Sequence, residues 1–283
     1  MKTFKDYLKA SRKLEGWLDT DAARVIDYCN LLQEKAGITG NICEIGVHHG
    51  RTTVLLGTFI KPEKERLIVN DIFDLQQFNI SVSGYGSEKI FLRNLTDFFE
   101  TLDFLTVIKK PSSELTVEET TGDCRIFVID GGHTAEETLT DMRTAFRALG
   151  EKGIIIIDDY FTFEFPGVSE GVCRFLFEEE GLVPWIYCFK QMLLIKKAAV
   201  EFYEDLLEKH DFDSFCRAHR FVIQRKLFFG QNIRVLRKPN RLQYLIHLVE
   251  MKARRRPDLF NRIKGSPGFS WLRTLYQKFY TPK

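Results

Sequence analysis

The sequence contains few cysteines, no Cys-x-x-Cys pair and no long uninterrupted hydrophobic run. Its six scattered cysteines argue against a disulfide framework or a zinc site of the usual spacing, and they favour a reducing compartment. Residues 1–18 interrupt their apolar positions with charges, unlike a signal peptide, and no segment has the length of a membrane span. We therefore expect a cytoplasmic protein, with peripheral membrane attachment as an open alternative.

Acidic residues are scarce in the C-terminal part of the chain. Residues 217–283 contain 17 Lys or Arg and only two acids, whereas residues 1–216 carry a net charge of −13. A basic segment on an acidic body favours an anionic partner. We expect residues 217–283 to contact an anionic membrane surface. Nucleic acid is disfavoured, because Lys252–Arg256 (KARRR) resembles no nucleic-acid motif, and a basic helical cap or a homo-oligomer contact is an equal alternative.

The rest of the sequence has ordinary globular composition, with 44% hydrophobic and 28% charged residues, so it can form a sizeable core. Short continuous apolar segments alternate with amphipathic ones, and this alternation predicts parallel strands that are buried on both faces. The expected strands are Asn41–Val47, Arg66–Phe73, Phe104–Lys109, Cys124–Asp130 and Gly153–Ile157.

Helices are expected between these strands, and the clearest is Thr134–Leu149, which begins with a Thr134–Glu137 capping box. Other helices are expected at residues 20–36, Arg51–Phe59, Ser87–Leu102 and Glu170–Glu180, and an antiparallel pair at Val183–Phe189 and Gln191–Lys197. The pattern predicts an α/β fold with a doubly wound, mostly parallel, seven-stranded Rossmann-like sheet. We divide the chain into an N-terminal helical segment (1–36), the sheet domain (37–198) and a basic helical C-terminal extension (199–283).

A glycine-containing turn follows the first expected strand, in the sequence Glu44–Gly50 (EIGVHHG). Gly46 and Gly50 allow a sharp turn and a close approach to a ligand, although a turn without any ligand explains them equally well. The spacing differs from the dinucleotide motif G-x-G-x-x-G, because His48 and His49 occupy its centre. This difference argues against an NAD-linked oxidoreductase.

Acidic residues stand at the carboxyl ends of the later strands. Asp71 ends the second strand, where a carboxylate can accept hydrogen bonds from ribose hydroxyls, or serve as a loop or capping acid. Asp130 ends the fourth strand and Asp158 and Asp159 end the fifth. Because neighbouring strands lie about 5 Å apart, these carboxylates would repel one another unless a hard cation such as Mg²⁺ bound them. The alternative is that they cap the following segments.

His133 follows Asp130 closely and precedes the helix that begins at Thr134. A neutral imidazole at that position could take a proton from an acceptor hydroxyl whose pKa a metal has lowered. His48 and His49 are rival bases, and an ordinary surface role is the simplest explanation of any single histidine.

Two motifs together resemble a known family. Phe127–Thr134 (FVIDGGHT) and Gly153–Tyr160 (GIIIIDDY) resemble the class I S-adenosylmethionine (SAM)-dependent methyltransferases grouped with macrocin and other sugar O-methyltransferases, some of which carry a cephalosporin hydroxylase label. Many relatives have Asp-Gly-Asp-His, whereas this sequence has Gly132 at the third position. That departure leaves open whether His133 is the base.

The resemblance implies which residues form the site. SAM would lie over the first three strands, and the predicted cofactor-binding residues are Glu44, Gly46, Gly50, Thr52, Asp71, Ser112, Ser113 and Asp130. Mg²⁺ would be held by Asp130, Asp158 and Asp159, with His133 as the catalytic base.

The predicted function follows from these residues. We expect a SAM-dependent, Mg²⁺-assisted O-methyltransferase acting on a sugar, glycolipid precursor or other small hydroxylated natural product. The alternative is a non-catalytic binding protein whose basic tail docks on an anionic membrane or nucleic acid. Residues Gln76–Gly86 (QQFNISVSGYG) are either a lid over the cofactor or a disordered surface loop.

Overall fold

The computed structural model describes residues 2–254 of the chain. By its internal contacts the chain divides into two compact units. The first comprises the residues up to His210 together with Arg225–Val235, and the second comprises Asp211–Gln224 and the described residues from Leu236 on. None of the helices within residues 2–254 is long and apolar enough to cross a membrane.

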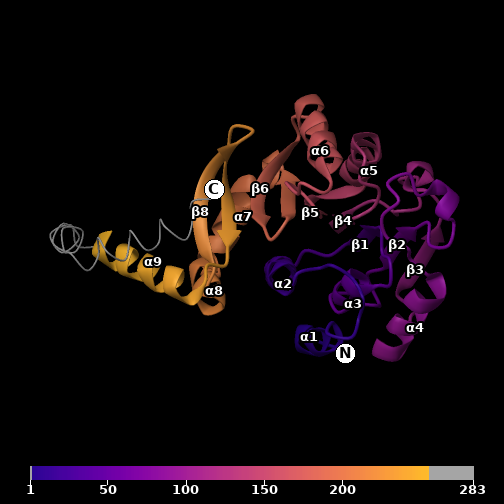
Figure 1. The fold of residues 1–283 in the computed structure, drawn as a ribbon, viewed down its shortest axis with the longest axis horizontal. Coiled ribbons are helices and arrows are strands. Elements are labelled where there is room, and N and C mark those ends of the chain that lie inside the picture. Colours follow the sequence, from indigo (N-terminus) through magenta and orange to yellow (C-terminus); the bar gives the residue numbers. More distant parts are fainter. Residues whose placement is uncertain (1, 255–283) are drawn as a thin grey trace. The chain divides into compact units, whose positions relative to one another are not determined.

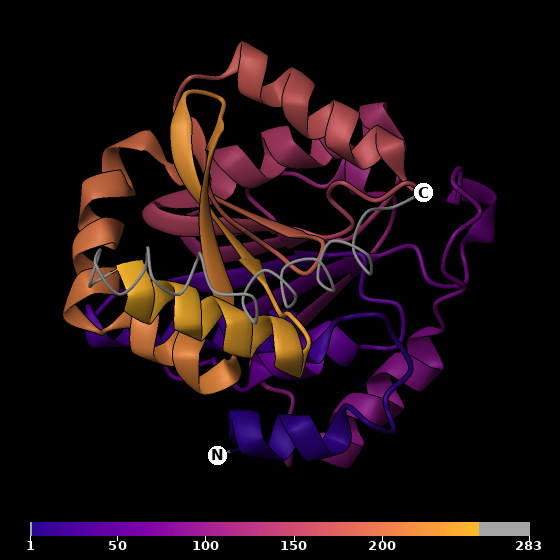
Figure 2. The same cartoon turned by 60° about the vertical axis from the view of Figure 1, so that its left-hand side comes forward.

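A single sheet of nine strands forms the centre of the structure, in the order β3-β2-β1-β4-β5-β7-β6-β9-β8 (Figures 1 and 2). Strands β1 to β5 are parallel, and β7 joins β5 in the antiparallel direction. The first seven strands are β1 (Asn41–Ile45), β2 (Leu67–Asp71), β3 (Leu105–Lys109), β4 (Cys124–Ile129), β5 (Leu149–Ile157), β6 (Leu182–Cys188) and β7 (Gln191–Lys196). The doubly wound, mostly parallel sheet predicted from the sequence is thereby confirmed.

The strands owe their position to continuous apolar sequence. All six residues of β4 are buried, and Ile154–Ile157 of β5 have no exposed surface. Helices α2 (Thr20–Lys35) and α3 (Arg51–Gly57) lie on one face of the sheet, and α5 (Ala135–Ala148) and α6 (Pro166–Glu178) lie on the other (Figure 1). Burial on both faces is what distinguishes these strands from alternating, half-exposed ones.

The helices of the first unit include some that begin with a side-chain cap and some that do not. They are α1 (Phe4–Ala10), α2 (Thr20–Lys35), α3 (Arg51–Gly57), α4 (Glu88–Phe98), α5 (Ala135–Ala148), α6 (Pro166–Glu178) and α7 (Val200–Lys209). The predicted capping box of α5 is confirmed, because the backbone N–H of Glu137 donates to the Thr134 hydroxyl at 3.2 Å and the Glu137 carboxylate accepts from the Thr134 N–H. This cap fixes the chain directly after His133.

The prediction that residues 199–283 are wholly helical was wrong for one segment. Helices α8 (Phe212–His219) and α9 (Arg241–Arg254) are present, but strands β8 (Val222–Phe228) and β9 (Gln231–Arg237) lie between them. Phe229 and Gly230 join these strands with φ angles of 47° and 71°, as a tight hairpin turn of the primed type requires. The sheet therefore has nine strands, where seven were expected. Residues 255–283 of the expected helical extension lie outside the described residues, and membrane contact through residues 217–283 stays a prediction.

Asp141 of α5 is a buried acid in the first unit, and it makes the stability of the protein depend on pH. Burial raises the pKa of Asp141 from 3.8 to about 7, while the Ser112 hydroxyl acts in the opposite direction. Because the folded-state pKa lies above the unfolded-state value, the contribution of Asp141 to stability is fully present below about pH 4 and is lost as the pH rises towards 7.

We expect Asp141→Asn, which cannot ionise, to stabilise the protein more at pH 8 than at pH 5, by about 2–3 kcal/mol. Chemical denaturation at both pH values measures the difference. The exposed helical residue Asp97 provides the matched control, Asp97→Asn, for which no such difference is expected. Equal stabilisation by Asp141→Asn at both pH values would refute the assignment.

Candidate functional site

A cavity of about 930 Å³ lies at the carboxyl ends of the parallel strands, within the first unit. Its size is that of a typical small-molecule or cofactor site. Most of the residues predicted from the sequence line it, namely Gly46, Thr52, Asp71, Ser112, Ser113, Asp130, His133, Asp158 and Asp159. Glu44 and Gly50 are not among the residues that line the cavity. The strand ends therefore bring predicted site residues that are far apart in the sequence together around one cavity.

The turn after β1 depends on Gly46. This residue has a φ of 80°, and a Cβ atom there would lie 1.9 Å from the carbonyl oxygen of Asp130. Only glycine allows the ends of β1 and β4 to approach so closely.

Asp71 holds the same turn from the end of β2. Its Oδ2 accepts hydrogen bonds from the N–H groups of Val47 at 2.7 Å and His48 at 2.9 Å, and its Oδ1 accepts one from Phe73 at 2.6 Å. The carboxylate thus shapes the wall of the cavity that it also lines.

Glu44 and Gly50 support the cavity from beneath. The Glu44 carboxyl is buried and accepts a hydrogen bond from the Thr53 hydroxyl at 2.7 Å, and burial raises its pKa to about 8. Gly50 starts α3 with a φ of 87°, close against Leu95 and Phe91 of α4. Their predicted contact with a cofactor stays a prediction.

The ends of β4 and β5 bring together three carboxylates, Asp130, Asp158 and Asp159, which we call the acidic cluster. Asp130, Asp159 and His133 each offer one potential metal-ligand atom, and these atoms lie within 4.8 Å of one another. Asp158, also predicted as a metal ligand, is not a member of this group, and its Oδ1 accepts a hydrogen bond from the Asp159 N–H at 2.7 Å. All four side chains line the cavity.

The carboxyl groups of the acidic cluster lie close together and are largely buried, so ionisation of Asp130 and Asp158 is unfavourable. Burial, followed by the charges of Asp158 and Asp159, raises the pKa of Asp130 well above its ordinary value. Burial and the charge of Asp159 also raise the pKa of Asp158 to about 7. Such shifts report a cost of ionisation that a bound divalent cation would offset. In the group formed by Asp130, Asp159 and His133, the two carboxylate oxygens suit Mg²⁺ or a similar hard cation, and the third donor is an imidazole nitrogen.

Lys190 reaches the acidic cluster, although the sequence reasoning did not identify it. Its Nζ lies 3.6 Å from Oδ1 of Asp159. Lys190 occupies the turn between β6 and β7, and because β7 runs antiparallel to β5 with Met192 opposite Ile157, this turn lies at the carboxyl end of β5. The antiparallel pairing of these two strands was predicted from the sequence. The position of the turn between them could therefore have indicated that Lys190 lies near the acidic residues.

His133 is held in place by three neighbours. Its Nδ1 lies 2.8 Å from the Ser83 hydroxyl oxygen, its Nε2 lies 3.6 Å from Oδ2 of Asp159, and its ring stacks on Phe165 at 3.8 Å. Ser83 belongs to the loop of residues 76–86, several of whose members line the cavity. These contacts favour the lid over the surface loop.

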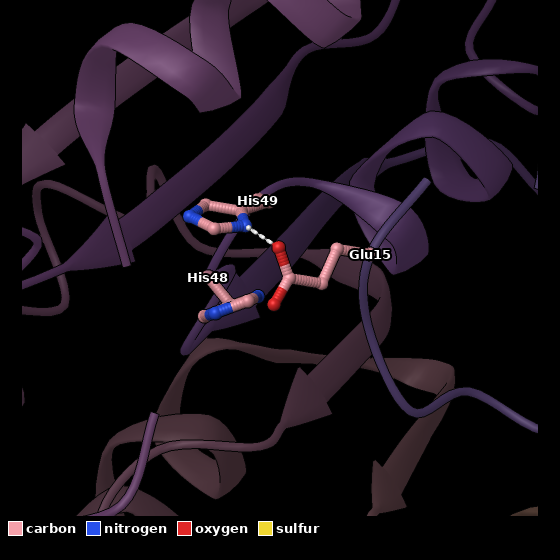
Figure 3. Close-up of side chains that lie close together, drawn as sticks. All are labelled: Glu15, His48 and His49. Atoms are coloured by element: carbon pink, nitrogen blue, oxygen red, sulfur yellow. Dashed lines mark hydrogen bonds and ion pairs between the residues drawn. The ribbon is translucent and has the colours of Figure 1, made fainter. Parts of the chain in front are cut away.

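A second group of titratable side chains lies at the β1–α3 turn. His48 and His49 face Glu15, and Nδ1 of His49 lies 3.1 Å from Oε2 of Glu15 (Figure 3). Glu15 and His48 line the cavity, whereas His49 is buried behind it. We call these three residues the histidine cluster.

Comparison with known proteins finds a family model that matches part of the chain. Residues 43–160, from β1 to the residue after Asp159, match the profile of a family described as a methyltransferase domain. No curated protein matches the sequence.

Solved structures with a similar fold include the O-methyltransferase NovP, with a TM-score of 0.51 and 15% identity over 62% of this chain and 80% of that one. The O-methyltransferase from Bacillus cereus, in complex with SAH, aligns with a TM-score of 0.45 and 13% identity over 69% of this chain and 92% of that one. At these identities the likeness to NovP concerns the fold.

Proposed function

We propose that this chain, as a class I SAM-dependent methyltransferase, methylates a hydroxyl group of a small acceptor. The proposed acceptor is a sugar or a similar small molecule, and a divalent cation assists the reaction. The observation that carries the proposal is the position of His133 beside the acidic cluster, in the same cavity as Asp71. Methyl transfer from SAM to the oxygen of a weakly acidic hydroxyl needs a base that takes the hydroxyl proton and charge stabilisation at the same place. The resemblance to sugar O-methyltransferases supports the class of acceptor.

Asp71 has the capacity to bind the ribose of SAM, which supplies the methyl group when bound. Each carboxylate oxygen can accept two hydrogen bonds. Oδ2 accepts two from the β1–α3 turn, but Oδ1 accepts only the one from Phe73 among the described residues. One acceptor position of Asp71 therefore remains for a ribose hydroxyl, while Gly46 keeps the adjoining backbone free of side-chain bulk.

Asp130, Asp158 and Asp159 would hold the cation. When bound, Mg²⁺ would orient the acceptor hydroxyl and lower its pKa. Lys190, which neutralises part of the Asp159 charge at 3.6 Å, is exposed over 59% of its side chain. It can therefore turn away from Asp159 and face an anionic group of an acceptor.

His133 would take the proton of the acceptor hydroxyl. When the Nδ1–H donates to the Ser83 hydroxyl oxygen, Nε2 carries a lone pair and can accept a proton. Oδ2 of Asp159, 3.6 Å from Nε2, would then stabilise the positive charge that the ring acquires. In this mechanism the Ser83 hydroxyl orients the ring and is compatible with the tautomer whose Nε2 is free.

The test is a methyl-transfer assay with purified protein. We expect conversion of SAM to S-adenosylhomocysteine (SAH) in the presence of free and nucleotide-linked sugars, and a rate at least about tenfold lower when EDTA replaces Mg²⁺. Mass spectrometry of the product identifies the methylated oxygen. An equal rate in EDTA would overturn the metal-assisted mechanism, and methylation of nitrogen alone would overturn the class of acceptor.

Ser83→Ala is expected to lower kcat about tenfold while leaving the Kd for SAM unchanged, because it removes the group that orients His133. Ser81→Ala is the matched control, because Ser81 lies in the same loop and contacts Ser83. An effect of Ser81→Ala as large as that of Ser83→Ala would mean that the loop, and not the hydroxyl of Ser83, determines the rate.

A further inference from the structure

We propose that the histidine cluster, Glu15, His48 and His49, binds one borderline transition-metal ion such as Zn²⁺. The three residues come from two segments, since Glu15 lies between α1 and α2 whereas His48 and His49 lie in the β1–α3 turn. Each offers one ligand atom, and these atoms all lie within 4.8 Å of one another. Figure 3 shows the two imidazole rings on one side, facing the Glu15 carboxylate.

The distances suit a shared ion. Nδ1 of His49 and Oε2 of Glu15 are 3.1 Å apart. Two ligand atoms that each lie about 2.1 Å from a Zn²⁺ ion are separated by roughly 3.0–3.4 Å for bond angles between a right angle and the tetrahedral angle. The His49–Glu15 pair therefore already has the separation of two ligands of one ion, and the ligand atom of His48 lies within 4.8 Å of both.

The local backbone brings the two rings together. His48 has a φ of 48°, in the left-handed region that a non-glycine residue seldom adopts. Adjacent side chains in an extended segment would point in opposite directions, but here the ring centroids of His48 and His49 lie 3.8 Å apart. The ring of Trp17 packs against His48 at 4.8 Å and covers it.

The chemistry of the donors selects the kind of ion. Two imidazole nitrogens and one carboxylate oxygen suit Zn²⁺, Co²⁺ or Ni²⁺ better than Mg²⁺, which prefers oxygen ligands. A neutral imidazole can bind a metal through one of its ring nitrogens.

An unsatisfied polar atom also points to a missing ligand. Nδ1 of His48 is buried and has no hydrogen-bond partner among the residues that the structure describes. A buried ring nitrogen without a partner is unfavourable, whereas coordination of an ion by the cluster would compensate for it.

The bound ion would fasten the N-terminal segment to the wall of the cavity. Glu15, Gly16, Trp17 and His48 all line the cavity. Arg51 already joins the two segments, because its guanidinium donates to the carbonyl oxygens of Leu14 and Gly16 at 3.2 Å. An ion between Glu15 and the histidines would add a second link. The site differs in donor type from the acidic cluster, and its occupancy does not depend on methyl transfer.

The experiment is a calorimetric titration of metal-free, full-length protein with Zn²⁺, in a background of Asp159→Ala. This background breaks the group formed by Asp130, His133 and Asp159, which could also bind Zn²⁺. We expect one equivalent of Zn²⁺ to bind. Introducing Glu15→Gln should weaken binding at least about tenfold, because a charged ligand is lost. Glu15 is exposed over 69% of its side chain, so this substitution should not disturb folding.

Two controls distinguish the histidine cluster from other sites. Glu164→Gln, an exposed change in a residue that lines the same cavity, should leave Zn²⁺ binding unchanged. Substituting Co²⁺ should give a visible spectrum without thiolate-to-metal bands, which excludes the six cysteines as ligands. Absence of Zn²⁺ binding, or equal binding with and without Glu15→Gln, would overturn the proposal. Either result would leave SAM binding and methyl transfer untouched.

Discussion

Asp158→Asn is expected to reduce the rate of methyl transfer at least about a hundredfold at saturating SAM. The amide keeps the shape of the side chain and can still accept the hydrogen bond from the Asp159 N–H. It removes one negative charge from the acidic cluster, where the proposed cation would bind. Steady-state rates over a range of Mg²⁺ concentrations measure the effect, and the Mg²⁺ concentration for half-maximal rate should rise.

Stability provides the control that separates a catalytic role of Asp158 from a structural one. Burial and Asp159 raise the pKa of Asp158 to about 7, so at pH 8 the ionised carboxylate destabilises the metal-free folded state. Asp158→Asn should therefore raise Tm in EDTA while it lowers activity, as is common when a functional site is relieved of strain. Glu164→Gln, in the same cavity, should change neither quantity. Full activity of Asp158→Asn in EDTA would rule out the metal mechanism.

The positions of the acids could be predicted from the sequence because they depend on topology alone. Asp71, Asp130 and Asp158 each end or directly follow a continuous apolar strand, and parallel strands end at one edge of the sheet. Strands β8 and β9 escaped prediction because they are half-exposed and rich in charge, as in Gln224–Lys226, and resemble the helical segments on either side. The glycine-containing turn at Phe229–Gly230 was the one feature of this segment's sequence that could have indicated a hairpin.

The partners of the predicted residues could not be derived in the same way. Ser83 meets His133 across 50 positions of sequence, and Glu15 meets His49 across 34. Both contacts depend on how irregular loops fold over the cavity, which no hydrophobic periodicity specifies. The position of Lys190 could be predicted in part. The pairing of the two strands that flank its turn was predictable, but the direction of its side chain was not. Topology thus determines where the site lies, and loop conformation determines which residues complete it.

Asp71→Ala is expected to weaken the binding of SAH at least about a hundredfold. The substitution removes the proposed acceptor of the ribose hydroxyl, and a charge-assisted hydrogen bond of this kind contributes about 1.5–3 kcal/mol. It also frees the N–H groups of Val47 and His48, which Asp71 holds at 2.7 and 2.9 Å, so the turn beneath the ligand loosens. Calorimetric titration with SAH measures the sum of both losses.

Asp71→Asn separates the two contributions to SAH binding. The asparagine oxygen can still accept from Val47 and His48, whereas its amide nitrogen cannot accept from a ribose hydroxyl and would face the N–H of Phe73. An affinity close to that of Asp71→Ala would mean that the ribose contact dominates, and one close to wild type would mean that the support of the turn dominates. Asp74→Asn is the control, because Asp74 is an exposed acid that pairs with Lys109. If Asp71→Ala itself binds SAH as tightly as wild type, Asp71 holds the turn without contacting the cofactor.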